Sequence, residues 1–233
     1  MSLMPGVVYN VLQQRQRGVT SESIKKLERL IEGLADVFAR SWHLSELSIS
    51  ANGRIGRSLR SRLLKLSVDL PDSGLRRLAR QAILAVDNGM LEQLPLVLTH
   101  GDLLPSNLVV DETTGELTGV IDWAEAEYLP FGLALYGLDH LLGVMSTSGQ
   151  FVYYTQSELL RQLFWTRLIR EVAALADARV LRAVMLARTV GVLLWHGYAW
   201  DDGKIERVVD AQRDAGELAY LRAFLQADSK PLL

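Results

Sequence analysis

Residues 96–123 are the part of this sequence that most constrains its fold. Three short apolar runs, at 96–99, 107–111 and 117–121, have the length and composition of β-strands, and Glu-Thr-Thr-Gly-Glu predicts a hairpin loop between the last two. Polar residues stand at the ends of these runs: His-Gly-Asp follows the first, and Asp-Trp follows the third. Because a hairpin brings its two ends together, we expect these polar residues to share one edge.

The rest of the sequence has the periodicity of helices. Apolar residues recur at steps of three and four from 21 to 42, and again after Asp72 or Ser73, either of which is a suitable N-cap for a helix that ends near 94. Further helices are predicted at 131–144, 156–176, 178–196 and 205–225. The predicted fold class is therefore mainly α (α+β), a helical body with a small inserted β-hairpin.

A locally basic stretch lies between 54 and 65. Its charged residues are Arg54, Arg57, Arg60, Arg62 and Lys65. Leu59, Leu63 and Leu66 in the same stretch could form a short apolar face. Two interpretations stay open: the basic residues are the solvated face of a helix, or they form a patch that binds an anion.

Composition excludes several classes of protein. With 49% hydrophobic residues, 22% charged residues and a net charge of -2, the chain reads as a globular protein without the basic field that would attract nucleic acid or an anionic membrane. The chain has no cysteine, which excludes disulfides and thiolate sites and fits a cytoplasmic location. Its longest strongly apolar stretch, 190–195, is far shorter than the roughly 18 residues of a membrane span.

We expect the first residues not to be a targeting signal. Met1-Ser2-Leu3 has neither the basic start nor the apolar core of a signal peptide, and a second methionine, Met4, follows directly. We therefore expect residues 1–3 to be a vector-derived extension. The natural segment would then begin at Met4 and run as one body over 4–233.

Three oxygen-bearing side chains suit phosphoryl transfer. A carboxylate that orients the attacking hydroxyl and divalent metal that neutralises phosphate charge are the main needs of this reaction. Asp102 suits the first role, while Asn107 and Asp122, brought together by the hairpin, supply the oxygen ligands that Mg²⁺ prefers. Gly101 allows a tight turn before Asp102, and His100 is expected to brace the loop by hydrogen bonding.

These motifs resemble the catalytic and metal loops of the aminoglycoside phosphotransferase and choline kinase-like family, whose members are relatives of protein kinases. The resemblance implies that Asp102 is the catalytic base, and that Asn107 and Asp122 hold Mg²⁺ bridging the phosphates of ATP. The tripeptide Met-Pro-Gly at 4–6 is similar to one that follows the hinge between the two lobes in that family. The resemblance thus covers a C-terminal lobe: helical at 4–95, catalytic and metal loops at 96–130, and helical at 131–233.

The N-terminal lobe of such a kinase has no counterpart in the sequence. A glycine-rich strand-turn-strand and a strand lysine are needed to hold the phosphates, and Gly53-Arg54-Ile55-Gly56 is too short and poorly placed to replace them. No lysine precedes the catalytic loop in an apolar β run; the lysines are Lys25, Lys26, Lys65, Lys204 and Lys230. The prediction is a phosphotransferase lobe, acting on a small-molecule hydroxyl, that has little or no activity as an isolated chain.

An alternative is a shortened, pseudokinase-like helical module that binds a partner or dimerises without catalysis. The surface that an N-terminal lobe would cover is expected to expose apolar residues and to promote a homodimer. The residues concerned are Val7, Val8, Tyr9 and Leu12.

The remaining candidate residues do not identify the substrate. The sequence has Phe131-Gly132-Leu133-Ala134 where the family commonly has an aspartate before leucine and alanine, so the support from that aspartate is missing. The cluster 195–203 contains Trp195, Tyr198 and Trp200, and is either an aromatic cage for a cation or a helix end packed into the core. His140 and His196 lack a companion at helical spacing, so a metal pair is not expected.

Several acidic residues either face a substrate or lie on a solvated surface. They are Glu125, Glu127, Asp139, Asp201 and Asp202. Aminoglycoside, choline, a sugar and an amino-acid derivative are all compatible with the motifs.

Overall fold

The computed structural model describes residues 5–15, 20–45, 53–199, 201 and 206–227. Its α-helices are α1 (Tyr9–Arg15), α2 (Ser21–His43), α3 (Arg54–Asp69), α4 (Ser73–Asp87), α5 (Tyr136–Leu141), α6 (Ser157–Glu171), α7 (Ala178–His196) and α8 (Ala215–Ala227). Its strands are β1 (Val7–Val8), β2 (Leu96–Thr99), β3 (Leu108–Val110), β4 (Leu117–Val120), β5 (Glu127–Pro130), β6 (Gly143–Met145) and β7 (Phe151–Tyr153). Short 3-10 helices are η1 (Leu91–Gln93), η2 (Pro105–Asn107), η3 (Leu133–Leu135) and η4 (Ala173–Ala176).

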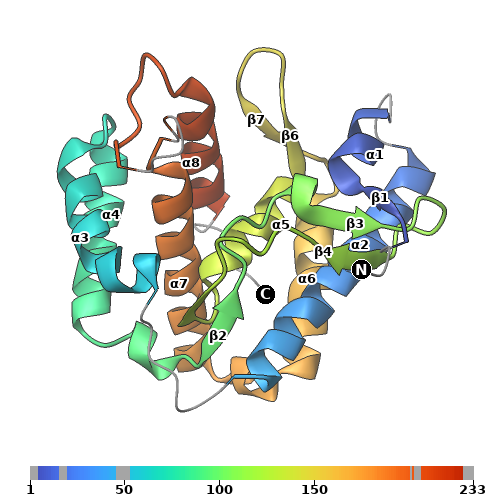
Figure 1. Ribbon diagram of the computed structural model, residues 1–233, viewed down its shortest axis with the longest axis horizontal. Helices are drawn as coiled ribbons and strands as arrows, with labels where there is room; N and C mark the ends of the chain where they lie inside the picture. The colour runs from blue at the N-terminus through green and yellow to red at the C-terminus, as the bar shows by residue number, and fades with distance from the viewer. Residues whose placement is uncertain (1–4, 16–19, 46–52, 200, 202–205, 228–233) are drawn as a thin grey trace.

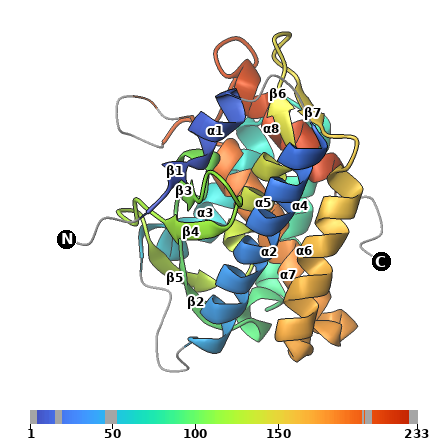
Figure 2. The same cartoon turned by 90° about the vertical axis from the view of Figure 1, so that its right-hand side faces the viewer.

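The helices form two groups that meet at α5 and α7 (Figure 1). The pair α3 and α4 packs against one side of α7, while α2 lies along α6 on the other side of the molecule (Figure 2). The fold is mainly α with small sheets, as the periodicity predicts. None of the described helices combines the length and the hydropathy that a membrane span requires.

Capping residues explain where the best-predicted helices begin. Thr20 and Ser23 form a reciprocal capping box at the start of α2, and the Asp72 carboxylate accepts hydrogen bonds from the first turn of α4. The helix that begins at Ser73 ends at Asp87, earlier than the predicted 94. Asn88 caps it, and Gly89 follows with a φ of 75°, a left-handed conformation that helices do not continue through.

The small sheets carry the polar motif as predicted. Strands β3 and β4 pair antiparallel, with Leu108 opposite Val120, and β1 pairs with the other edge of β3. The loop between β3 and β4 is closed by Asp111, whose carboxylate accepts hydrogen bonds from the backbone of Thr113 and Thr114. Strand β2 pairs with β5, which the sequence does not predict.

Other predicted helices also differ in extent from the structure. The segment 131–144 holds only the short η3 and α5 before the chain turns into strand β6, because Gly132 has a φ of 106° and interrupts the helix at its start. The helix predicted at 205–225 begins at Ala215. The carboxylate of Asp214 accepts from the backbone of Asp210 and from Arg207, which stabilises a turn before α8.

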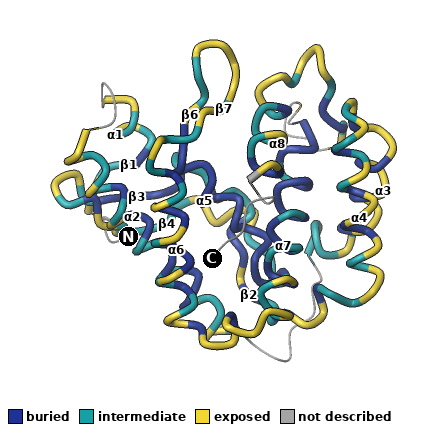
Figure 3. The backbone as a smooth tube through the Cα atoms, turned by 180° about the vertical axis from the view of Figure 1, so that it is seen from behind, coloured by how far each residue is buried: buried dark blue, intermediate teal, exposed yellow. Residues whose placement is uncertain are grey.

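The core runs along α5 and the second half of α7, where most residues are buried (Figure 3). Inside it, Asp139 is 0% exposed and receives hydrogen bonds from Arg188, Arg161 and Tyr153 at 2.6, 3.0 and 3.1 Å. Burial by itself raises the pKa of Asp139, but the two guanidinium groups outweigh burial and hold this pKa below its ordinary value. The solvated position expected for Asp139 is therefore wrong: its carboxylate joins α5, α6 and α7.

The basic stretch of α3 is largely held by contacts within the protein. Arg60 forms two hydrogen bonds to Asp87 of α4, and Lys65 donates to the carbonyl oxygen of Glu206. On the opposite face Leu63 and Leu66 are fully buried, as predicted. The interpretation as a solvated helix face is the one that these contacts favour.

The apolar surface expected at the start of the chain is only partly present. Tyr9 and Leu12 are buried, since α1 packs against η2 and β3, while Val7 and Val8 of β1 are half-buried. The exposure predicted for Tyr9 and Leu12 is therefore wrong. The homodimer itself stays a prediction, which sedimentation can check. The expectations for residues 1–3 and for Met4 lie outside the described residues.

Candidate active site

Asp102 and Asn107 lie at the two ends of one tight loop between β2 and β3. The loop folds back through η2, so the side-chain amide of Asn107 donates to the Asp102 carbonyl oxygen at 2.7 Å and to Asp102 Oδ2 at 3.0 Å. These bonds use the Nδ2 group, and they leave Asn107 Oδ1 as a potential metal ligand. The structure thus brings together the predicted base and one predicted ligand.

The second carboxylate oxygen of Asp102 accepts no hydrogen bond from the described part of the chain and is free to accept one. Asp102 Oδ1 is buried and has no hydrogen-bond partner among the described residues. Burial raises the pKa of the Asp102 carboxyl above its ordinary value; the Asp122 charge adds to this, whereas the Asn107 hydrogen bond and His100 oppose it. A carboxylate with a raised pKa is a better proton acceptor, which is what a base for a hydroxyl group needs.

Asp122 follows β4 and has an unusual backbone conformation. Its φ of 61° makes it the one non-glycine residue in the described ranges that lies in the left-handed region. The Ile121 amide before it donates to the Asn107 carbonyl oxygen at 2.9 Å, so the end of β4 is tied to the end of η2. Backbone strain of this kind is concentrated at functional sites, where the surrounding structure maintains it.

His100 joins the two loops. The Asp102 amide donates to His100 Nδ1 at 3.1 Å, and therefore Nε2 carries the proton and donates to the Ile121 carbonyl oxygen at 2.8 Å. The ring also lies edge-on against Trp123, with centroids 4.7 Å apart. These bonds place the Asp102 loop and the Asp122 loop next to each other.

Gly101 is required by the close approach of the same two loops. A Cβ atom at this position would overlap the carbonyl oxygen of Glu125, three residues after Asp122. Both partners are backbone, so neither can turn away as a side chain could. The glycine between His100 and Asp102 thus follows from steric contact as well as from turn geometry.

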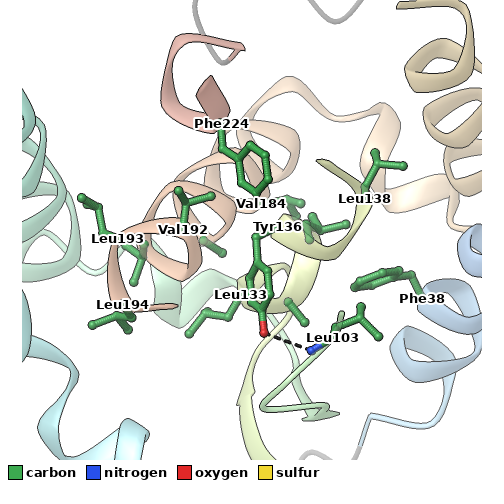
Figure 4. Packing of buried hydrophobic residues seen from close by; sticks show 14 of the residues in the cluster. Phe38, Leu103, Leu133, Tyr136, Leu138, Val184, Val192, Leu193, Leu194 and Phe224 are labelled. Atoms are coloured by element: carbon green, nitrogen blue, oxygen red, sulfur yellow. Dashed lines mark hydrogen bonds between the residues drawn. The ribbon is translucent and has the colours of Figure 1, made fainter. Parts of the chain in front are cut away.

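Tyr136 of α5 supports the Asp102 loop by hydrogen bonding, and the sequence does not single this tyrosine out. The Leu103 amide donates to the Tyr136 hydroxyl at 3.2 Å (Figure 4), and the hydroxyl lies 3.4 Å from the Gly101 carbonyl oxygen. Burial raises the pKa of Tyr136, so the hydroxyl stays neutral. A tyrosine inside an apolar helical stretch reads as a core residue, and no local signal reveals its contact with residues more than 30 positions earlier.

We expect Tyr136→Phe to loosen this loop. The Leu103 amide would lose its acceptor inside the core, which costs about 1 to 2 kcal/mol. Hydrogen exchange measured by NMR should be faster at Leu103 in the variant. Tyr128→Phe is a suitable control, because it removes the same hydroxyl from a tyrosine on β5 and leaves the bond between Leu103 and Tyr136 in place; equal exchange at Leu103 in both variants would argue against this role.

Two cavities flank the loop. One of about 380 Å³ opens beside His100 and Gly101, and the other, of about 560 Å³, opens beside Ser106. Trp195 and Glu217 line both of them. The sequence does not connect these two residues with the Asp102 loop, because α7 and α8 reach it only through the packing of the helices.

The aromatic cluster is packed into the core, and two of its residues also line a cavity; the cage for a cation stays a prediction. Trp195 stacks on Tyr136 with centroids 5.3 Å apart, and Tyr198 donates to the Arg62 carbonyl oxygen at 2.9 Å, so both are packed against other helices. At the same time both line the cavity beside His100. Trp200, Asp202 and Gly203 of the predicted cluster lie outside the described residues.

The acidic candidates occupy different environments. Glu127 accepts hydrogen bonds from the Ile55 and Gly56 amides and thereby caps α3, whose N-cap Gly53 has no side chain to do so. Asp201 is paired with Arg207. Glu125 lines the cavity beside His100.

The residues that could hold a metal are oxygen donors. No group of three or more His, Cys, Asp or Glu side chains in the described ranges is arranged as a metal site, and this includes the contacting pair His140 and His196. Asn107 and Asp122 alone would provide two ligands. This donor set fits Mg²⁺, which keeps water and takes phosphate oxygens as its remaining ligands.

Comparisons with known proteins identify a family for this chain. The model of the phosphotransferase enzyme family matches residues 5–133, more than half of the chain, whereas no curated protein sequence matches. Choline kinase from Cryptosporidium parvum Iowa II is similar in structure, with a TM-score of 0.50 and 12% identity over 89% of this chain and 66% of that one. An ethanolamine kinase from Plasmodium vivax has a TM-score of 0.50 and 13% identity over 99% of this chain and 64% of its own.

At these identities the likeness concerns the fold, and the chain spans less than two thirds of the length of either kinase. The family match is independent of that likeness and includes β1 to β5 with both loops of the site. The chain belongs to the phosphotransferase enzyme family.

Proposed function

We propose that this chain carries the catalytic and metal loops of an ATP- and Mg²⁺-dependent phosphotransferase that acts on a hydroxyl group of a small molecule. The observation that carries the proposal is the joined pair of loops: Asn107 holds one oxygen of Asp102, while His100 ties Asp102 to the Asp122 loop. Asp102 Oδ1 has no hydrogen-bond partner among the described residues, and Gly101, the residue before Asp102, lines a cavity that can hold a small molecule.

In this proposal Asp102 Oδ1 accepts a hydrogen bond from the acceptor hydroxyl and orients it. A new bond forms between the oxygen of the acceptor hydroxyl and the γ-phosphorus of ATP. The bond between the γ-phosphorus and the β,γ-bridging oxygen breaks, and the proton of the hydroxyl passes to Asp102. Asn107 and Asp122 would hold Mg²⁺, which neutralises phosphate charge when bound. The Asn107 amide keeps Asp102 correctly oriented throughout.

We further propose that the chain supplies one part of such an enzyme. Lys25 and Lys26 lie on α2 and Lys65 on α3, so none of the described lysines is a strand lysine that could clamp phosphate. We therefore expect little ATP turnover by this chain alone, and we assign residues 4–233 to the C-terminal lobe of a kinase-like pair of lobes.

Metal binding tests the proposal without requiring turnover. Mn²⁺ can replace Mg²⁺ as a paramagnetic probe, and we expect it to broaden the NMR signals of Asp102 and Asn107 first. Asp122→Asn should weaken Mn²⁺ binding about tenfold or more, since it removes a charged ligand. The matched control is Asp111→Asn on the same hairpin, whose carboxylate closes its own turn. Equal Mn²⁺ affinity in both variants would contradict the assignment.

The acceptor is proposed to be a small alcohol that carries an amine. Trp195 and Tyr198 provide aromatic surfaces in the cavity, and Glu217 provides a carboxylate, a combination that attracts organic cations. The two structurally similar kinases are named for choline and ethanolamine, which are both amino alcohols. A neutral sugar would make less use of these groups.

A further inference from the structure

Trp123 ends the Ile-Asp-Trp motif, and its indole is fixed although the residue is 42% exposed. The indole Nε1–H donates to the Val120 carbonyl oxygen at 2.8 Å. The ring also contacts the His100 ring, with centroids 4.7 Å apart and the two planes at 65°. Both contacts belong to the loops of the candidate active site, and the proposed reaction gives the indole no role.

The hydrogen bond from the indole spans Asp122. Its donor is on Trp123 and its acceptor is on Val120, so the bond closes a ring that contains the backbone between them. Inside this ring Asp122 has a φ of 61°. The left-handed conformation is unfavourable for a residue with a Cβ atom, although aspartate tolerates it better than most residues. Because the ring brings residues three positions apart into contact, it disfavours the extended conformations that Asp122 would otherwise adopt.

The backbone around Asp122 is held from two sides. The carbonyl oxygen of Ile121 accepts a hydrogen bond from His100 Nε2 at 2.8 Å, which fixes the peptide plane before Asp122. On the other side, residues 122–125 are exposed. The contacts of the Trp123 indole with Val120 and with His100 therefore anchor this side to β4 and to the Asp102 loop.

The backbone conformation of Asp122 decides where its carboxylate lies. Asp122 is exposed, so packing does not enclose its side chain, and the direction of its Cα–Cβ bond follows from the backbone. Asn107 is fixed differently, because its side-chain amide donates to the carbonyl oxygen and to Oδ2 of Asp102. A cation shared by Asn107 and Asp122 therefore requires the backbone of Asp122 to keep one conformation.

We propose that Trp123 is a positioning residue, whose indole holds Asp122 in the left-handed conformation in which the Asp122 carboxylate and the Asn107 amide oxygen can share one divalent cation. Trp123 needs no contact with the cation or with phosphate, since it acts through Asp122. The inference rests on the proposed function in taking Asp122 as a metal ligand. Its conformational part, that the indole fixes the φ of Asp122, is independent of any ligand.

NMR of the chain without metal tests the conformational part. In the unaltered chain we expect slow hydrogen exchange at Trp123 Nε1–H despite its exposure, and a strong NOE between the amide proton and Hα of Asp122, which is typical of a positive φ. Trp123→Phe removes the donor and keeps an aromatic ring near His100, so this NOE should weaken as other conformations become populated. Trp123→Ala should weaken it further. Fast exchange at Nε1–H in the unaltered chain, or an equal NOE in all three proteins, would overturn the proposal.

Mn²⁺ binding tests the consequence for the site. Groups that orient a metal ligand typically contribute tenfold or more to metal affinity, so Trp123→Phe should weaken Mn²⁺ binding about tenfold. Trp42→Phe on α2 is the matched control, since it makes the same substitution in a ring that packs against Phe131. Thermal unfolding separates positioning from folding, because a lower affinity without a lower unfolding midpoint than the control cannot come from a less stable fold. Equal Mn²⁺ affinity in the two variants would count against the proposal.

Mg²⁺, which is diamagnetic, allows the same NOE to be measured with the cation bound. A cation that binds one conformation preferentially shifts the population towards it. Saturating Mg²⁺ should therefore restore the NOE of Asp122 in Trp123→Phe. An NOE that stays weak at saturation would contradict the link between the indole and the metal ligand.

The proposed function and this inference fail separately. If the unaltered chain binds no Mn²⁺ at Asp122 while the NOE responds to the Trp123 variants as expected, the proposed function is refuted and the conformational role of the indole stands. If Mn²⁺ binds at Asp122 with equal affinity in the unaltered chain and in Trp123→Phe, the proposed function stands and the positioning role is refuted.

Discussion

Replacing Asp139 by asparagine is expected to lower the free energy of unfolding by about 3 to 5 kcal/mol, because it leaves two buried guanidinium groups without their counter-ion. Arg188 is 2% exposed and Arg161 is 8% exposed, so water cannot take the place of the carboxylate. Asparagine keeps the shape and one acceptor oxygen, which isolates the effect of the charge. Chemical denaturation followed by far-ultraviolet circular dichroism measures the loss.

Asp87→Asn is the matched control, because it removes the carboxylate from an exposed ion pair with Arg60. Exposed pairs contribute little, so only a small change is expected there. The two variants should also differ in acid. The pKa of Asp139 is held below its ordinary value, so its stabilisation is present at neutral pH and is lost as the pH falls below about 4. Equal losses in the two variants would show that the buried network does not stabilise the fold as described.

Gly191→Ala is expected to destabilise the protein by about 1 to 3 kcal/mol, although alanine is the better helix former. Gly191 lies in the middle of α7, and a Cβ atom there would overlap the carbonyl oxygen of Leu133 in η3. Both groups belong to backbones, so α7 would have to move away from the segment that leads to Tyr136. Thermal and chemical unfolding both measure this cost.

Gly216→Ala is expected to raise the free energy of unfolding in the same experiment, whereas Gly191→Ala lowers it. Gly216 lies in α8, and a Cβ atom there would meet nothing within 4 Å. Without a steric conflict, the change should stabilise the protein by about 0.5 to 1 kcal/mol through lower backbone entropy of the unfolded chain. If both glycine variants change the stability in the same direction, the close contact between Gly191 and Leu133 is not a constraint on the fold.

Helices with a clear apolar face and a cap are predictable from this sequence. The prediction for 21–42 agrees with α2 to within one residue, and 178–196 agrees with α7. Local physics is sufficient there, because the periodicity defines the buried face and a cap defines the start. The prediction of one helix over 131–144 is wrong because local sequence is not sufficient there. Gly132 lies against Val184 and Ala187 of α7, so the conformation of Gly132 depends on a helix distant in sequence.

The reactive loop is predictable because its residues are close in sequence. Asp102, Asn107 and Asp122 are joined by one loop and one hairpin, and His100 and Gly101 belong to the same segment. Their spacing alone therefore suggests a shared cleft and a type of chemistry. Their roles in catalysis remain proposals that the Mn²⁺ experiment tests.

The sequence by itself determined the helical class of the fold, the hairpin and the loop that joins His100 to Asn107, since each of these depends on contacts within a few tens of residues. Only the tertiary structure decided what surrounds that loop. The hydrogen bond between Tyr136 and Leu103 comes from a helix remote from the loop in sequence. The same holds for the hydrogen bond between Glu217 and His196, which joins α8 to α7. Such contacts depend on which helix faces pack together, and this packing is a property of the whole core that no short pattern encodes.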